Sequence, residues 1–287
     1  MHNHENEFRI ATMCRVLTVS RSAYYQWRSL QSSFSERQRN NADVLENIRT
    51  IHAQSKQTYG SPRVTAQLRR EGTLVNEKRV AKLMRDNALR AKTKKRFTVT
   101  TNSTKTKNAS PNLVKQEFRA ARPNQLWTSD LTYIWTREGW LYLAIILDVF
   151  ARRIVGYAMS TRISATLVTT ALSHALTQRQ VSAGLVLHSD QGTQYASDEV
   201  RTLLTTHHLT QSMSGKGNCY DNAITETFFH TLKTELIYWE RFVTRDEARS
   251  KIFDYIEVWY NRQRLHSSLG YQTPVEFEQQ YQQAITT

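Results

Sequence analysis

Cysteine is scarce in this chain, which has only Cys14 and Cys219 among its 287 residues. The two lie far apart and form no CxxC pair, which excludes a disulfide framework and a zinc finger. Long apolar runs are also missing. The longest, residues 141–147, suits a buried strand and is too short to span a bilayer. The polar start does not resemble a signal peptide, so we expect a cytoplasmic protein without a membrane partner.

Acidic residues are few in the first part of the chain. Residues 1–110 hold 22 Lys and Arg against 8 Asp and Glu, whereas residues 111–287 hold 17 of each kind. The formal net charge of +14 therefore belongs entirely to the first 110 residues. This asymmetry predicts a polyanion-binding front part joined to a back part with a different task. The alternative is a basic surface that only faces solvent.

Residues 1–57 are predicted to begin with two short helices around a turn, with Ser20 capping the second. This pattern resembles a helix-turn-helix, and it makes Arg21 and Tyr25 candidates for DNA contact. A polar helix follows over residues 35–55. Its sparse apolar stripe consists of Leu45, Ile48 and His52.

A second helix-turn-helix-like unit is predicted over residues 58–90. Ser61 is the expected cap of its first helix, with Pro62 at the first helical position. Gly72 fits the left-handed residue after that helix, and Asn76 caps the next one. The basic residues on the outer faces that we take as candidate DNA contacts are Arg63, Lys78, Arg79 and Lys82. The alternative is a pair of amphipathic helices whose charges are merely solvated.

The pattern changes to α/β from residue 123, after a basic linker over residues 91–122 that can track a phosphate backbone or be disordered. Strands are expected at 125–136, 140–150, 153–160, 185–188 and 209–213. Helices are expected at 164–180, 197–207, 222–238 and 245–264. An antiparallel meander followed by parallel strands with crossing helices is the ribonuclease-H-like arrangement, a mixed five-stranded sheet, which we assign to residues 123–287. The expected core aromatics are Trp127, Trp140, Phe228, Phe229 and Trp259.

Two of these strands carry a carboxylate. Asp130 interrupts the apolar alternation of the first strand, where burial is costly for an unpaired charge. Asp190 ends the fourth strand, in the stretch HSDQGTQYAS. Because the first and fourth strands are neighbours in this fold, the two carboxylates can share one edge of the sheet. Taken alone, each aspartate is more simply a turn former or a helix cap.

The third acid is Glu226, on a predicted helix, with 35 residues between it and Asp190. Asn222 and Lys233 lie on the same helical face. Three converging carboxylates repel one another unless cations neutralise them, and oxygen ligands of this kind suit Mg²⁺. Two such ions can clamp a scissile phosphate. The alternative is that the three acids are unrelated. Three other acids have simpler structural explanations at strand or helix ends: Asp148, Asp198 and Asp221.

At these residues the sequence resembles the DDE transposases of bacterial insertion sequences, and more narrowly the second-frame (OrfB-type) proteins of the family closest to retroviral integrases. The resemblance covers nearly the whole chain. Five stretches carry it: WTSDLTYI (127–134), LDVFARRIVGY (147–157), HSDQGTQYAS (188–197), SMSGKGNCYDNAITETFFHTLKTE (212–235) and YNRQRLHSSLGYQTPVEFE (260–278).

The resemblance implies that Asp130, Asp190 and Glu226 hold two Mg²⁺ ions, for which Mn²⁺ is an expected substitute. Lys233 fits the family's basic residue that contacts the transposon end, and Asn222 on the same face is a further candidate. The N-terminal units would bind terminal inverted repeats of double-stranded DNA. The enzyme would cleave element ends and join the freed 3′-OH to other DNA, as a homo-oligomer that associates with the nucleoid when bound.

Two positions depart from the family pattern: Ser129 stands where threonine is commoner, and Gly215 where a basic residue is more usual. Active enzymes of this family are often frameshift fusions, so an upstream-frame protein is a further expected partner. A nuclease that only hydrolyses and a non-catalytic DNA-binding regulator are the alternative functions. His188 is expected to pack or hydrogen-bond. A structural role is favoured over a DNA contact for His266, and the role of Arg264 stays open.

Overall fold

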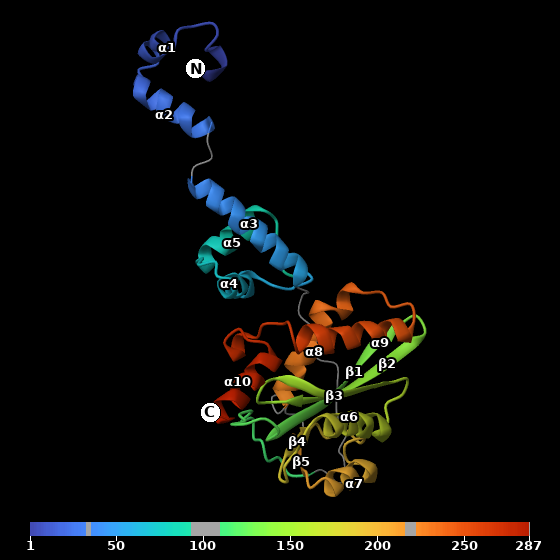
Figure 1. The fold of residues 1–287 in the computed structure, drawn as a ribbon. Coiled ribbons are helices and arrows are strands. Elements are labelled where there is room, and N and C mark those ends of the chain that lie inside the picture. Colours follow the sequence, from blue (N-terminus) through green and yellow to red (C-terminus); the bar gives the residue numbers. More distant parts are fainter. Residues whose placement is uncertain (33–35, 93–109, 216–221, 287) are drawn as a thin grey trace. The chain divides into compact units, whose positions relative to one another are not determined.

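The computed structural model of the chain describes four stretches, residues 1–32, 36–92, 110–215 and 222–286. Cys219, Asp221 and much of the predicted linker lie outside the described residues. The chain divides into two compact units, Met1–Ala91 and Lys92–Thr287, and Figure 1 shows their elements. Within the four stretches, no helix is both long and apolar enough to cross a membrane.

Helices make up the regular structure of the first unit. They are η1 (His2–His4), α1 (Ile10–Val16), α2 (Arg21–Ser32), α3 (Glu36–Gln54), α4 (Ser61–Arg70) and α5 (Glu77–Asp86). The predicted cap of α2 is confirmed, because Ser20 Oγ accepts the N–H of Ala23 at 3.0 Å. Asn76 caps α5 in the same way, with its Oδ1 accepting the N–H of Lys78 at 2.8 Å. Both caps satisfy backbone donors that a helix start leaves unpaired.

The start of α4 differs from the prediction by one residue. Gly60, not Ser61, is the N-cap, and it has an extended backbone and no side-chain cap. Ser61 is already helical, and its carbonyl accepts the hydroxyl of Thr65. Proline fits either of the first two helical positions, because neither N–H has an intrahelical acceptor, so Pro62 does not decide between them. Gly72 has the predicted left-handed backbone, with φ +86°.

The helices α3, α4 and α5 share a small apolar core. On α4 and α5 the buried apolar residues are Val64, Leu68, Val80 and Met84, whereas Leu83, which its spacing also predicts to point inward, is half-buried. On α3 the buried residues are Val44, Ile48, Ile51 and His52. This i, i+4, i+7, i+8 spacing is one helical face. Leu45, which the sequence placed in the stripe, lies one residue off that face and is only half-buried.

A five-stranded mixed sheet forms the centre of the second unit. Its strands are β1 (Leu126–Thr136), β2 (Gly139–Asp148), β3 (Arg153–Ser160), β4 (Val186–Ser189) and β5 (Thr210–Met213). Their order in space is β3-β2-β1-β4-β5. The first three strands are antiparallel neighbours, whereas β1–β4 and β4–β5 are parallel pairs. The predicted ribonuclease-H-like sheet, with the first strand beside the fourth, is therefore confirmed.

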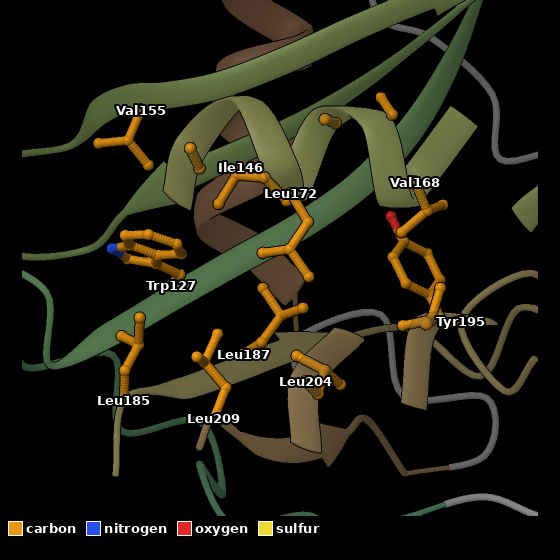
Figure 2. Packing of buried hydrophobic residues seen from close by; sticks show 14 of the residues in the cluster. Trp127, Ile146, Val155, Val168, Leu172, Leu185, Leu187, Tyr195, Leu204 and Leu209 are labelled. Atoms are coloured by element: carbon orange, nitrogen blue, oxygen red, sulfur yellow. The ribbon is translucent and has the colours of Figure 1, made fainter. Parts of the chain in front are cut away.

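Helices cover both faces of this sheet (Figure 1). They are α6 (Ala165–Gln178), α7 (Asp198–Thr206), α8 (Ala223–Glu235), η3 (Ile237–Trp239), α9 (Arg245–Phe253), η4 (Asp254–Tyr260), η5 (Ser267–Leu269) and α10 (Pro274–Thr286). Figure 2 shows Leu172 of α6 beside Ile146 and between Trp127 and Leu187 of the sheet and Val168 of α6, in one buried cluster. The helices α8 and α9 contact β1 from the opposite face. The helix predicted over 245–264 is α9 continued by the π-helical η4, and α10 was not predicted.

One of the five aromatic residues predicted for the core lies at the surface. Four are buried as expected: Trp127, Phe228, Phe229 and Trp259. The prediction for Trp140 was wrong, since this side chain is 42% exposed. Trp140 pairs with Trp135 beside the turn of the β1–β2 hairpin, and their rings lie 4.8 Å apart. At this end of the hairpin, alternate side chains face solvent.

Candidate active site

The parallel pair β1–β4 brings Asp130 and Asp190 to the same level of the sheet. Thr128 pairs with His188, and each aspartate lies two residues further along its own chain segment. Because β4 ends at Ser189, Asp190 begins the turn that leaves the sheet. The carboxyl ends of parallel strands are where open α/β sheets place ligand sites. Here that end carries two half-buried carboxylates.

A tight turn fixes the carboxylate of Asp190. Its Oδ1 accepts the N–H of Gly192 at 3.0 Å. A Cβ on residue 192 would lie 2.9 Å from that oxygen and 2.7 Å from Nε2 of Gln194, so a larger residue would displace one of these side chains. Before the turn, His188 is buried and its Nδ1 lies 2.9 Å from Oγ of Ser212 on β5. His188 therefore packs and hydrogen-bonds, as predicted.

The helix α8 places Glu226 beside the first aspartate. Thr225 Oγ1 donates to Thr128 Oγ1 at 2.7 Å, and Asn222 Nδ2 donates to the carbonyl of Ser129 at 3.4 Å. These bonds hold the first turn of α8 against the two β1 residues that precede the first aspartate. Glu226 directly follows Thr225, and its side chain is exposed to solvent.

The three carboxylates and one lysine form a single electrostatic cluster. Burial, followed by the charges of Asp190 and Glu226, raises the pKa of Asp130 to about 8. The N–H of Leu131, which Asp130 Oδ1 accepts at 2.7 Å, and the ammonium of Lys233 act in the opposite direction. Burial also raises the pKa of Asp190 and of Glu226. Burial lowers the pKa of Lys233, and the charge of Asp130 partly offsets that.

These side chains do not close on a common point. Among the residues that the structure describes, no three Asp, Glu, His or Cys side chains are arranged to hold a metal ion. Like charges without a cation between them repel one another or keep protons. A shared ion would require the exposed Glu226 side chain to turn toward Asp130 and Asp190.

A buried pair of hydroxyls lies behind Asp130. Ser129 Oγ donates to the carbonyl of Ile145 at 2.8 Å, and Tyr195 Oη lies 2.8 Å from the same Oγ. Burial and the charges of Asp130 and Asp190 raise the pKa of Tyr195 well above its usual value. Tyr195 therefore stays protonated and donates to Ser129. Tyr195 lies within the stretch HSDQGTQYAS, but the sequence analysis predicts no role for it. Figure 2 shows it in the core cluster.

The two predicted DNA contacts on α8 lie at different depths. Lys233 is half-buried, with its Nζ 5.4 Å from the centre of the Tyr133 ring. Asn222 is buried, and its Oδ1 has no hydrogen-bond partner among the described residues. The DNA contact of each residue stays a prediction.

Arg264 and His266 belong to the protein interior. Arg264 makes a buried, bidentate ion pair with Glu235 at the end of α8, with contacts of 2.7 Å and 2.9 Å to Oε1. Glu235 also accepts hydrogen bonds from Tyr255 and Trp259. His266 is buried beside Arg264. This packing supports the structural role favoured for His266. It supports a structural role for Arg264 as well.

Two further acids have the structural roles predicted for them. Asp148 accepts the N–H groups of Asn124 and Phe150, and it pairs with Arg179 at 3.3 Å. Asp198 lies in the first turn of α7, where a negative charge favours the helix dipole.

The predicted DNA contacts in the first unit differ in exposure. Four of them are exposed, namely Arg21, Tyr25, Lys78 and Lys82. Arg63 is half-buried, with its guanidinium 5.8 Å from the centre of the Tyr59 ring. Arg79 is half-buried and joins α5 to α3, since its Nε donates to Asn41 at 2.9 Å and its Nη2 reaches Asn40 at 2.5 Å.

Comparison with known proteins places the two units in known families. The integrase core domain matches residues 120–219 and again 226–281, and the HTH-like domain matches residues 38–97. The Transposase InsF for insertion sequence IS3A of Escherichia coli (strain K12) is 42% identical over 278 residues, which is 97% of this chain and 96% of that protein. The chain belongs to the insertion-sequence transposases. The transposase is thus an enzyme of the DDE transposase and integrase class.

Another relative is the Insertion element IS600 uncharacterized 31 kDa protein of Shigella sonnei. It is 45% identical over 271 residues, which is 94% of this transposase and 99% of that protein. Among solved structures, the simian T-cell lymphotropic virus intasome in complex with PP2A regulatory subunit B56 gamma has a TM-score of 0.49 at 15% identity, covering 80% of the transposase and 74% of that chain. The HTLV-2 integrase catalytic core domain in complex with magnesium has a TM-score of 0.44 at 17% identity, covering 56% of the transposase and 99% of that chain.

Proposed function

We propose that this transposase cuts and joins DNA at the ends of its insertion sequence with Asp130, Asp190 and Glu226 as the catalytic carboxylates. The register of β1 and β4, which puts Asp130 and Asp190 at one level of the sheet, carries the proposal. Burial and the charges of Asp190 and Glu226 raise the pKa of Asp130 to about 8. Such mutual repulsion destabilises the metal-free protein. Acids whose pKa is strongly shifted in this way are concentrated at functional sites.

The donor set suits Mg²⁺, which prefers carboxylate and water oxygens. Asp130, Asp190 and Glu226 would hold the metal, for which we propose two ions with Mn²⁺ as a substitute. Asn222 Oδ1, a buried acceptor without a partner among the described residues, could receive a hydrogen bond from a bound water. When bound, such ions activate the attacking oxygen and stabilise the leaving oxygen.

The two reactions balance without a bond to the protein. In the first, water attacks the phosphorus at the 3′ end of the element, the bond from phosphorus to the element's 3′ oxygen breaks, and the flanking DNA keeps the 5′-phosphate. In the second, the freed 3′ oxygen attacks another phosphodiester, whose own 3′ oxygen leaves. Tyr195 and Ser129 hold β1 in place behind Asp130. The ammonium of Lys233 would bind a phosphate of the transposon end.

The first unit would recognise the terminal inverted repeats. Its exposed cations suit DNA phosphates, and Arg21 and Tyr25 lie on α2, the second helix of the helix-turn-helix. Arg63, Lys78 and Lys82 would bind the DNA backbone. Arg79 stays among the proposed contacts, although it also joins α5 to α3. Since two ends must be held together, we propose a homo-oligomer on DNA, with an upstream-frame protein as partner or fusion, working at the bacterial nucleoid in the cytoplasm.

The test compares Glu226→Gln with Glu199→Gln, which alters an exposed acid in the first turn of α7. Both proteins are incubated with Mg²⁺ and labelled DNA that carries the element end, and products are separated by size. Glu226→Gln should lose cleavage and joining while DNA binding changes little, and Glu199→Gln should keep all three activities. Equal loss of binding and cleavage in Glu226→Gln would contradict the metal-ligand role.

The same experiment separates the two alternatives. Nicked DNA without joined products would show a nuclease that only hydrolyses. DNA binding without any cleavage by the unaltered protein would show a regulator. The three acids in one electrostatic cluster favour strand transfer over the regulator.

A further inference from the structure

A pocket lies beside Lys233, and apart from that lysine its lining residues have no role in the chemistry described above. It has a volume of about 510 Å³ and lies between the β1–β2 hairpin and the segment that follows α8. Its lining residues are Tyr133, Trp135, Arg137, Trp140, Lys233, Ile237, Tyr238, Glu240, Arg241 and Phe242. Pockets of this size hold small organic groups.

Three aromatic side chains on the hairpin are exposed at this pocket. Trp135 is 59% exposed, Tyr133 47% and Trp140 42%. The ring of Trp140 packs edge-on against both others. Its centre lies 5.1 Å from the centre of the Tyr133 ring and 4.8 Å from that of the Trp135 ring. Large exposed aromatic groups are unfavourable in water and commonly mark a binding surface. Because the rings brace one another, they offer flat faces at little cost in conformational entropy.

The charge of the pocket favours an anionic occupant. Arg137, Lys233 and Arg241 contribute three cations to its lining. The lining contains one acid, Glu240, whose carboxylate is paired with Lys251 at 2.6 Å. Aromatic faces among cations are the features that bind single-stranded nucleic acid, in which bases stack and phosphates meet positive charge.

Lys233 joins this pocket to the carboxylate cluster. Its ammonium lies over the ring of Tyr133 and its charge acts on Asp130. DNA held at the carboxylates would therefore pass next to the pocket. We propose that the pocket binds an unpaired base of the DNA strand adjacent to the scissile phosphodiester, stacked on Trp135 and Trp140. This inference rests on the proposed function, because it takes DNA to be the substrate of the neighbouring site.

The test uses the full chain and a 12-nucleotide thymidine oligomer that contains one 2-aminopurine. Fluorescence is titrated in EDTA, so metal-dependent chemistry has no part in the signal. Trp135→Ala should weaken binding of this single strand by about 5- to 100-fold and lose quenching of the 2-aminopurine. Trp239→Ala is the matched control, because Trp239 is 49% exposed and lies outside the pocket lining. It should change affinity by less than about 2-fold.

Equal affinities of Trp135→Ala and Trp239→Ala for the single strand would overturn the proposal. So would an equal loss for the fully paired duplex, which has no unstacked base to offer. A change in sedimentation of Trp135→Ala without a change in strand binding would assign the patch to contact between copies of the chain. Glu226→Gln separates this proposal from the proposed function, since it should still quench the probe while it fails to cleave.

Discussion

Replacing Asp130 with asparagine should stabilise the metal-free transposase while it abolishes cleavage. Asparagine has nearly the same shape and carries no charge. The substitution therefore removes the repulsion from Asp190 and Glu226 and the penalty for burying a carboxylate. Most substitutions of a half-buried residue destabilise a protein, so the expected sign is unusual and informative.

The size of the effect follows from the pKa of Asp130, which is raised from 3.8 to about 8. Between these values the folded protein keeps a proton that the unfolded chain has lost, so stability falls as pH rises from about 4 to about 8. At pH 7 the part of the shift that lies between 3.8 and that pH corresponds to roughly 4 kcal/mol. Because Asp130 is partly exposed, solvent screening reduces this, and we expect about 1–2 kcal/mol in favour of Asp130→Asn.

Urea unfolding in EDTA measures this difference. The stability gain of Asp130→Asn over the unaltered protein should be small at pH 5 and should at least double by pH 8. Asp246→Asn is the control, because the Asp246 side chain is 96% exposed, and it should change the free energy of unfolding by less than about 0.5 kcal/mol. A gain that is equal at both pH values, or a loss at both, would refute the electrostatic account of the cluster.

Three other substitutions test the supports of the site and the division of labour between the units. Arg264→Ala should destabilise by about 3–5 kcal/mol in urea unfolding, because Glu235 would stay buried without its partner; a loss below about 1 kcal/mol would show that the pair is dispensable. Tyr195→Phe should lower stability by about 1 kcal/mol and slow cleavage by about 10-fold with unchanged DNA affinity; unchanged cleavage would remove Tyr195 from the positioning role. Deletion of residues 1–110 should abolish selection of the element end and flatten the salt dependence of DNA binding, measured by filter binding between about 50 and 200 mM salt. A fragment that still selects its end would contradict the assignment of end recognition to the first unit.

The sheet and its two aspartates were predictable because their signals are local or topological. Period-two alternation and short apolar runs mark strands in a sequence. Once β1 and β4 are neighbours, the register that pairs Thr128 with His188 puts Asp130 and Asp190 at one level. The helix of Glu226 was predictable from its apolar face, on which Phe228 and Leu232 are buried.

The hairpin and the C-terminal helix were less predictable, because their environment depends on tertiary packing. Trp140 alternates as a core residue would, but its ring lies against the exposed rings of Tyr133 and Trp135 and is itself 42% exposed. The helix α10 packs Phe277 and Tyr281 on Phe150. Its buried Glu278 pairs with Arg153 at 2.9 Å and Arg179 at 2.5 Å. A long-range ion pair of this kind leaves no periodic signal in the sequence.

The parts that support the site could not be identified from the sequence. Tyr195 reaches Ser129 across 66 residues of chain, and Arg79 reaches Asn41 across 38. Such contacts depend on how elements pack, whereas a residue type alone indicates only what it can bond. The sequence therefore indicated the chemistry of the site more fully than the hydrogen bonds that hold it.

Anomalous diffraction from crystals of the transposase grown with Mn²⁺ and DNA tests the central claim most directly. The account predicts manganese peaks bonded to carboxylate oxygens of Asp130, Asp190 and Glu226, with the Glu226 side chain turned inward from its metal-free position. In Glu226→Gln the peak nearest that residue should weaken or vanish. Manganese bound elsewhere, with the three carboxylates still apart and no ion among them, would contradict it.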